Sequence, residues 1–204
     1  MKIAALCLCF SLCVTAASAQ IAHLSFTSDP GDFIGLGQTR DMYYTPLNST
    51  YFPMENVGII RPLTGVGFTF GTVGDRALPF ASVSFSTRAL NIPFQIGTYL
   101  DAQRAPFAAP GHPGLDVTFD NRGSNTLTGF FVVRDLQYDS LNINHFLVDF
   151  EQHSEGSVPA LRGTFEFSSS TWVSAVPEPS TYALSGFLFI LILVAFRRIR
   201  HTKT

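Results

Sequence analysis

The stretch "FASVSFSTR", residues 80–88, alternates apolar and small polar side chains. Ala81, Val83 and Phe85 occupy every second position, and serines stand between them. Successive side chains of a β-strand point to opposite faces, so a period of two marks a strand with one buried face. The stretch therefore predicts a half-buried β-strand whose serine face meets solvent.

Similar alternation recurs in four other segments: "GVGFTFG" (65–71), "GLDVTFD" (114–120), "HFLVDFEQ" (145–152) and "LRGTFEF" (161–167, around Gly163). Prolines and glycines separate these segments at intervals of about 8–15 residues, which suits short antiparallel strands. We expect one all-β domain over residues 20–170, an antiparallel sandwich or jelly roll. The predicted core residues are Val66, Phe68, Phe70, Leu115, Val117, Phe119, Phe146, Val148, Phe150, Leu161, Phe165 and Phe167.

Residues 1–19 have the composition of a secretory signal peptide. Lys2 precedes a short apolar stretch, and Ala17-Ser18-Ala19 forms a small-residue cleavage site before Gln20. The alternative is a lipoprotein signal, since three cysteines lie in this segment. That signal needs a small residue before the cysteine, whereas leucine precedes each one here: Cys7, Cys9 and Cys13.

The predicted exported domain has no cysteine and no lysine. Cysteine-type zinc sites and a cysteine nucleophile are thereby excluded from it. Residues 20–176 carry eight arginines against 14 acidic side chains, a formal charge of −6 with neutral histidines. An acidic domain of this kind is a poor partner for nucleic acid, because phosphate binding depends on positive charge.

A second apolar segment, Thr181–Phe196, has 16 residues without a charge. As a helix it would span about 24 Å, somewhat less than the hydrocarbon core of a bilayer. Arg197, Arg198 and Arg200 follow it and place that side in the cytoplasm. We expect a linker at 171–180, then a transmembrane helix and basic tail at 181–204, with the β domain exported.

The motif before this helix is Val176-Pro177-Glu178-Pro179. The two prolines keep it extended and outside the helix. With the apolar helix and the arginines, it resembles the PEP-CTERM sorting domain, a tail also labelled as an ice-binding protein C-terminal domain. The resemblance implies removal by exosortase, a transient stay in the inner membrane, delivery to the cell surface or extracellular space, and a link to exopolysaccharide. The alternative is an ordinary linker with a permanent anchor.

A further resemblance covers residues 24–39, 100–133 and 147–170. Segments such as "GDFIGLGQ", "NRGSN" and "DFEQHSEG" are similar to an extracellular bacterial β module with GRGCN and DFEQHCEG motifs. Ser124 and Ser154 stand where the module has cysteines. The resemblance implies that those cysteines form a disulfide and that Ser124 and Ser154 are neighbours.

The domain has neither a G-x-S-x-G elbow, a P-loop nor an H-E-x-x-H motif. Asp149, Glu151, His153 and Glu155 are spaced by two and would share a strand face. They suit either a metal or acid–base cluster or a plain strand edge, in which Glu151 pairs with an arginine such as Arg122 or Arg162. The plain edge is favoured, and we predict no metal or catalytic residue.

In "SDPGDFIG", residues 28–35, Asp29 and Asp32 flank a Pro-Gly turn. Two carboxylates with nearby carbonyls could contribute to a calcium site, which requires six to eight oxygens. Calcium is the one cofactor that the sequence suggests, and a turn without a ligand is the simpler interpretation.

Three functions fit these features. The first is a non-catalytic surface or matrix protein whose β domain binds polysaccharide, the second an exported carbohydrate-active enzyme, and the third a structural spacer. The first is favoured because no catalytic motif appears. Four tyrosines are predicted to be exposed platforms for sugars: Tyr43, Tyr44, Tyr51 and Tyr99.

Overall fold

The computed structural model describes residues 20–50, 63–139 and 143–169. These residues form nine strands: β1 (Ile21–Ser28), β2 (Thr39–Tyr44), β3 (Gly65–Phe70), β4 (Ala81–Ser86), β5 (Gly97–Arg104), β6 (Gly114–Phe119), β7 (Leu127–Tyr138), β8 (Ile143–Ser154) and β9 (Ala160–Ser168). Two single turns of 3-10 helix complete the described elements, η1 (Arg88–Leu90) and η2 (Ala105–Phe107).

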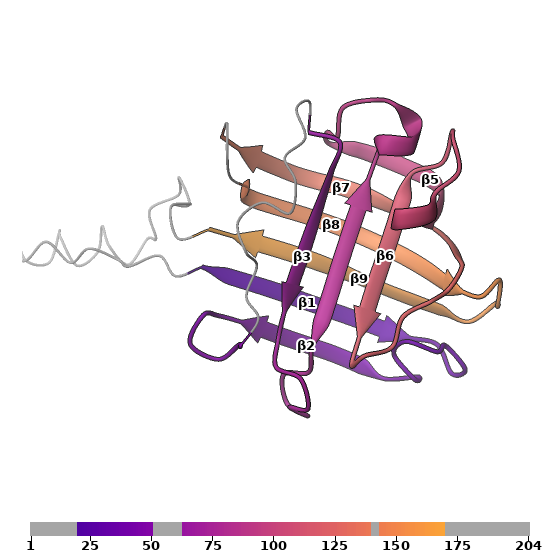
Figure 1. Ribbon diagram of the computed structural model, residues 1–204. Helices are drawn as coiled ribbons and strands as arrows, with labels where there is room; N and C mark the ends of the chain where they lie inside the picture. Colours follow the sequence, from indigo (N-terminus) through magenta and orange to yellow (C-terminus); the bar gives the residue numbers. More distant parts are fainter. Residues whose placement is uncertain (1–19, 51–62, 140–142, 170–204) are drawn as a thin grey trace, which may run out of the picture. The chain divides into compact units, whose positions relative to one another are not determined.

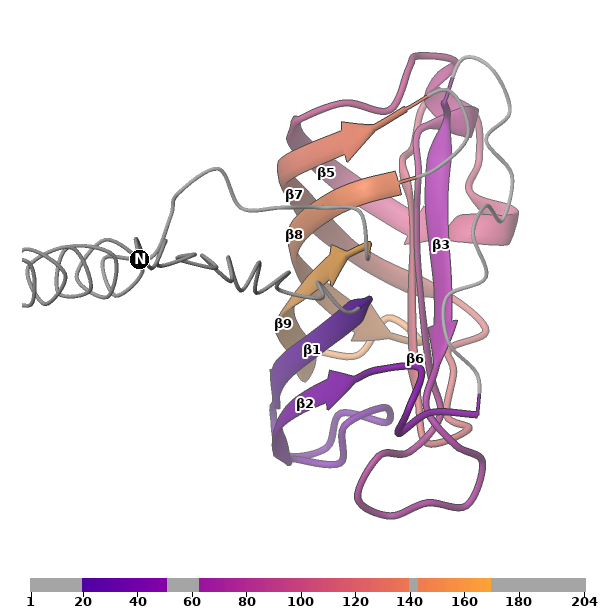
Figure 2. The same ribbon diagram turned by 90° about the vertical axis from the view of Figure 1, so that its left-hand side faces the viewer.

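The strands form one sheet in the order β2-β1-β9-β8-β7-β5-β6-β4-β3. Every neighbouring pair is antiparallel except β5 and β6, which meet in parallel over only two residue pairs. Strands β3 and β6 cross the strands behind them steeply in Figure 1, and Figure 2 shows the resulting two layers from the side. The prediction of an all-β, mostly antiparallel domain is confirmed. The sheet is nearly closed into a barrel, where the sequence predicted a sandwich or jelly roll.

The core lies between the two layers and consists largely of phenylalanine. Phe68 of β3 contacts three rings of the opposite layer, those of Phe146, Phe165 and Phe167, at centroid distances of 4.8–5.9 Å. The twelve core residues predicted from alternation are all buried, as are Ala81, Val83 and Phe85 of the opening stretch. Burial of these rings supplies the main drive for folding in a domain that has no cysteine.

Glycine at position 163 makes room for this packing. The residue lies on the inner face of β9, and a Cβ built there would stand 2.3 Å from the Ser25 carbonyl oxygen and 2.8 Å from the Phe150 ring. No other residue type fits so close to a neighbouring backbone. The Gly163 noted inside the apolar pattern of "LRGTFEF" therefore serves the packing of β9.

The two edge strands approach each other where the barrel nearly closes. The Tyr44 hydroxyl donates to the Pro79 carbonyl oxygen at 3.0 Å, and its ring lies 4.6 Å from that of Phe70. After β2, the Ser49 hydroxyl accepts from the Gly71 N–H at 2.6 Å. Side chains and loops thus bridge the gap between β2 and the end of β3.

A buried glutamine completes the sheet at its corner. The Gln152 side chain, on the inner face of β8, accepts from the Val117 N–H at 2.8 Å and donates to the Val117 carbonyl at 3.1 Å. Val117 lies in β6, and the short pairing of β6 with β5 ends at Leu115. The Val117 N–H and carbonyl therefore have no partner from strand β5. Gln152 replaces that partner and satisfies both groups in the core.

Candidate functional site

The outer face of the layer β2-β1-β9-β8-β7 is covered by polar and charged side chains. In β8 the side chains of Phe146, Val148 and Phe150 point inward, so the alternate residues point outward. Neighbouring strands contribute residues of the same kind because their register aligns the outward positions. This surface, here called the polar face, includes His23, Asp41, Tyr43, Arg134, His145, Asp149, Glu151, His153, Arg162, Thr164 and Glu166.

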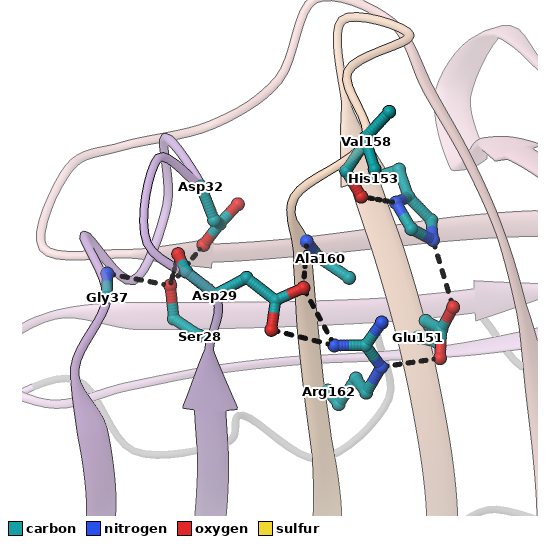
Figure 3. Close-up of polar contacts among 9 residues, drawn as sticks. All are labelled: Ser28, Asp29, Asp32, Gly37, Glu151, His153, Val158, Ala160 and Arg162. Atoms are coloured by element: carbon teal, nitrogen blue, oxygen red, sulfur yellow. Dashed lines mark hydrogen bonds and ion pairs between the residues drawn. The ribbon is translucent and has the colours of Figure 1, made fainter.

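Arg162 is the centre of the best-connected part of the polar face (Figure 3). Its Nη1 donates to both carboxylate oxygens of Asp29, at 3.0 and 2.9 Å, and its Nε donates to Glu151 Oε2 at 2.8 Å. Arg162 lies in β9, Glu151 opposite it in β8, and Asp29 directly after β1. One guanidinium therefore ties three strands together. The predicted pairing of Glu151 with an arginine is confirmed, and Arg162 is the partner among the two candidates.

These contacts favour the ionised forms of all three groups. The hydrogen bond from Arg162, followed by the Ala160 N–H, lowers the pKa of Asp29. Partial burial raises the pKa of Glu151, but hydrogen bonds from His153 and Arg162 outweigh it and leave that pKa lowered. The same bonds to Asp29 and Glu151 raise the pKa of Arg162. A carboxylate held in this way is a poor proton carrier near neutral pH.

His153 extends the chain of contacts to the β8–β9 turn. Its Nδ1 lies 2.8 Å from the Val158 carbonyl oxygen, and its Nε2 lies 2.9 Å from Glu151 Oε1. Both partners are hydrogen-bond acceptors. Glu155 does not join this group, since it binds the backbone N–H groups of Asn125 and Thr126. The row of three acids and one histidine predicted from spacing is thus divided between a strand face and a turn.

The Asp29–Asp32 turn uses both carboxylates within the fold. Asp29 accepts from the Ala160 N–H at 3.0 Å as well as from Arg162. Asp32 is buried, and its Oδ2 accepts from the Ser28 hydroxyl at 2.8 Å and the Gly35 N–H at 2.7 Å. The two carboxylates face different partners and do not converge, so the geometry favours a structural turn over the calcium site considered from the sequence.

The other end of the polar face holds a second histidine between carboxylates. His145 is buried, with its Nδ1 2.9 Å from Asp135 Oδ2 and its Nε2 3.1 Å from Glu166 Oε1. Next to it, Arg134 Nε donates to Asp149 Oδ2 at 2.7 Å. No motif in the sequence singles out His145. Its acidic partners come from β7 and β9, and only strand register brings them together.

An aromatic platform lies at the β1–β2 edge of the polar face. The rings of His23 and Tyr43 stack at a centroid distance of 4.0 Å and an interplanar angle of 5°. Asp41 Oδ1 lies 2.5 Å from His23 Nε2 and fixes the ring from the side. Tyr43 remains 55% exposed, so one face of the stacked pair is open to solvent.

The prediction of exposed tyrosines holds for Tyr43 and is wrong for two others. Tyr44 is fully buried, and Tyr99 is 7% exposed with its hydroxyl bound to the Gln95 carbonyl oxygen. Each points to the inner side of its strand, where its ring packs against phenylalanines. Tyr51 lies outside the described residues.

Ser124 and Ser154 are neighbours, as the family resemblance implied. The Ser124 hydroxyl donates to the Ser154 hydroxyl oxygen at 2.8 Å, and both side chains are buried. The contact ties the loop before β7 to the end of β8. Side chains this close suit the Cα separation that a disulfide needs.

The remaining predicted site residues lie outside the described ranges, except Gln20. They are the signal cleavage residues Ala17 and Ala19, the sorting motif Val176, Pro177, Glu178 and Pro179, and the arginines Arg197, Arg198 and Arg200. The predicted signal peptide, linker and transmembrane helix fall there too. Among the described residues, no helix has the length and apolar character to span a bilayer. Within the same ranges, no three His, Cys, Asp or Glu side chains are grouped so as to hold a metal ion.

Comparison with known proteins gives no relative. No family model, no curated protein and no solved structure matches the chain.

Proposed function

We propose that this chain is an exported, non-catalytic protein of the bacterial surface or extracellular matrix, and that its β domain binds polysaccharide on the polar face. The observation that carries this proposal is the exposed Tyr43 ring, stacked on His23 and bordered by fixed polar groups. Sugars present an apolar ring face and a rim of hydroxyls. An exposed aromatic ring beside ordered acceptors and donors matches both features.

The order of the polar face supports this proposal. Side chains such as Asp149, Glu151 and Arg162 already hold one another through hydrogen bonds. Binding therefore costs little side-chain entropy, and free lone pairs on these carboxylates remain as acceptors for sugar hydroxyls. The strong pairing of the same carboxylates supports a binding role over acid–base catalysis.

Delivery to the surface is proposed from the sequence motifs. The segment 1–19 would direct export, and 181–196 would hold the chain briefly in the inner membrane. Pro177-Glu178-Pro179 would then present an extended strip to exosortase, which releases the β domain. The measurement is the intact mass of the surface-released protein from cells with and without exosortase. A released form that still carries Thr204, or complete retention in the inner membrane, would contradict the sorting step.

A glycan array tests the binding proposal, with the full chain kept in non-ionic detergent micelles. We expect binding to a set of polysaccharide fragments and about fivefold or greater weakening in Tyr43→Ala, as expected for loss of one aromatic stack. Tyr138→Ala is the matched control, since Tyr138 is 48% exposed at the end of β7. Equal weakening by both variants, or no bound glycan, would refute the proposal, and the latter would favour a structural spacer. Shortened glycan products would point to the carbohydrate-active enzyme instead.

A further inference from the structure

A cavity of about 220 Å³ opens at one end of the barrel, and its lining includes none of the polar face residues named above. The β1–β2 connection, the β3–β4 connection and the turn after β6 form its walls. Figure 2 shows the first two of these connections at the same end of the domain. Its polar lining consists of Gln38, Arg40, Arg76, Asp120 and Arg122.

Positive charge is concentrated in this cavity although the domain is acidic. Of the seven arginines in the described ranges, Arg104, Arg134 and Arg162 form salt bridges with carboxylates. The other four have no carboxylate within salt-bridge distance among the described residues, and three of those four line this one cavity. Asp120 is the one acidic side chain in the lining, so the guanidinium charges exceed the carboxylate charge by two.

The backbone fixes two of these arginines. Arg122 ends a tight turn in which Phe119 and Arg122 exchange backbone hydrogen bonds of 3.0 and 2.9 Å, with left-handed φ angles of 49° at Asp120 and 60° at Asn121. Its guanidinium lies over the Phe33 ring at 5.4 Å. Arg40 shares the inward side of β2 with buried Met42, so it points into the end of the barrel. A fixed direction lowers the entropy cost of binding.

The donors that remain on these arginines are suited to an anion. Arg40 donates its Nε to Gln38 Oε1 at 2.9 Å, and its two terminal nitrogens make no hydrogen bond with a described residue. Arg76 projects from the β3–β4 loop, which Asp75 Oδ1 holds by accepting from the Ala77 N–H at 2.7 Å. Planar guanidinium forks match the paired oxygens of carboxylate, sulfate and phosphate. A bound oxyanion would also relieve the repulsion among three like charges.

We propose that this cavity is an oxyanion site, and that it binds the carboxylate or sulfate group of an acidic polysaccharide. The cavity is smaller than the roughly 300–1,000 Å³ of sites that enclose a whole ligand. It therefore takes one charged group while the rest of the glycan lies outside. The oxyanion site is inferred from the arrangement of the three arginines around the cavity. Its assignment to a polysaccharide rests on the proposed function.

Calorimetry on the full chain in non-ionic micelles tests the site with four probes: an oligogalacturonate, a sulfated oligosaccharide, inorganic phosphate and a neutral oligosaccharide of equal length. We expect the charged oligosaccharides to bind, with affinity falling as salt is added. Arg122→Gln and Arg76→Gln should each weaken them about tenfold, the effect of losing a charge-assisted hydrogen bond. Arg88→Gln is the control, because Arg88 is exposed, makes no salt bridge with a described residue and lies outside this cavity.

The outcomes separate this site from the polar face. Failure of all three anionic probes, or equal weakening by Arg88→Gln, overturns the oxyanion site even if neutral glycans bind through Tyr43. Binding of inorganic phosphate without either charged oligosaccharide supports the site and overturns its assignment to polysaccharide. Arg76 is exposed in a loop, so its variant keeps the fold and tests the site even if Arg122→Gln unfolds the protein.

Discussion

At the scale of single residues, Arg162 shows how one side chain can join distant parts of a chain. It binds Asp29, 133 positions earlier, and Glu151 in the neighbouring strand. Arginine suits this position because its guanidinium presents several donors in one plane and stays charged. Exposed ion pairs contribute little stability individually, so the main effect of this contact is to fix the geometry of the polar face.

The Arg162 contacts predict a pH dependence of stability. The pKa values of Asp29 and Glu151 are lowered in the folded protein from ordinary values of 3.8 and 4.5. Their contribution is thus fully present above those ordinary values and is lost as pH falls through the lowered ones. Arg162→Gln should lower the Tm by a few degrees at most at pH 7.

Thermal melts of both proteins from pH 7 to pH 3 check this expectation. The difference in Tm should shrink as the pH falls below about 4.5. Asp116 acts in the opposite direction, since burial raises its pKa, but it is present in both proteins and cancels in the comparison. A Tm difference that grows toward pH 3 would show that Arg162 stabilises the fold by another route.

At the scale of elements, β8 serves both layers of the sheet. Its inner face packs Phe146 and Phe150 against the opposite layer, and its outer face carries Glu151 and His153. Gln152 is the polar exception on the inner face, where it binds the backbone of β6. A long strand with this alternation can therefore hold the barrel corner and the polar face at the same time.

Replacing Gln152 should weaken the corner of the sheet. Gln152→Leu keeps a similar volume but leaves the Val117 N–H and carbonyl without partners in the core. We expect a loss of about 2–4 kcal/mol in the free energy of unfolding, measured by urea denaturation. Gln137→Leu, an exposed change on β7, should alter it by about 0.5 kcal/mol or less. Equal effects of the two substitutions would show that the buried amide has no special role.

At the scale of the whole molecule, closure of the barrel depends on contacts between residues far apart in the sequence. The parallel β5–β6 pairing is short, and Gln152, the loop after β2 and the aromatic core complete the enclosure. Ser124 and Ser154 form a further connection of this kind, 30 positions apart. In a domain without cysteine, their buried hydrogen bond is one of the contacts that join these segments, beside those of Glu155 with Asn125 and Thr126.

A disulfide at this position should stabilise the whole domain through its unfolded state. Closing a loop of about 30 residues removes chain entropy worth about 3–4 kcal/mol. The double substitution Ser124→Cys with Ser154→Cys should therefore raise the Tm under oxidising conditions and lose that gain when a reductant is added. Each single substitution serves as a control and should show no dependence on reductant. A double variant that oxidises without a rise in Tm would indicate strain in the bridge.

The sequence by itself determined five of the nine described strands and their two faces: β3, β4, β6, β8 and β9. Alternation at residues 80–88 and in the four similar segments placed the inward phenylalanines correctly, because the β-strand period is a local property of the backbone. The same logic could not place tyrosines that lie outside a clear pattern, so Tyr44 and Tyr99 were wrongly predicted as exposed. The Ser124–Ser154 contact was anticipated from a family resemblance and not from spacing.

Only the tertiary structure decided which polar residues meet. The acids around His145, the Arg162 contacts and the arginine cavity join side chains from strands and loops far apart in the chain. Strand order and register bring these positions together, and both follow from closing the sheet around its aromatic core. A local sequence pattern does not indicate how the sheet closes. The charged residues could therefore be counted from the sequence, but the gathering of three arginines at one cavity could not be predicted from it.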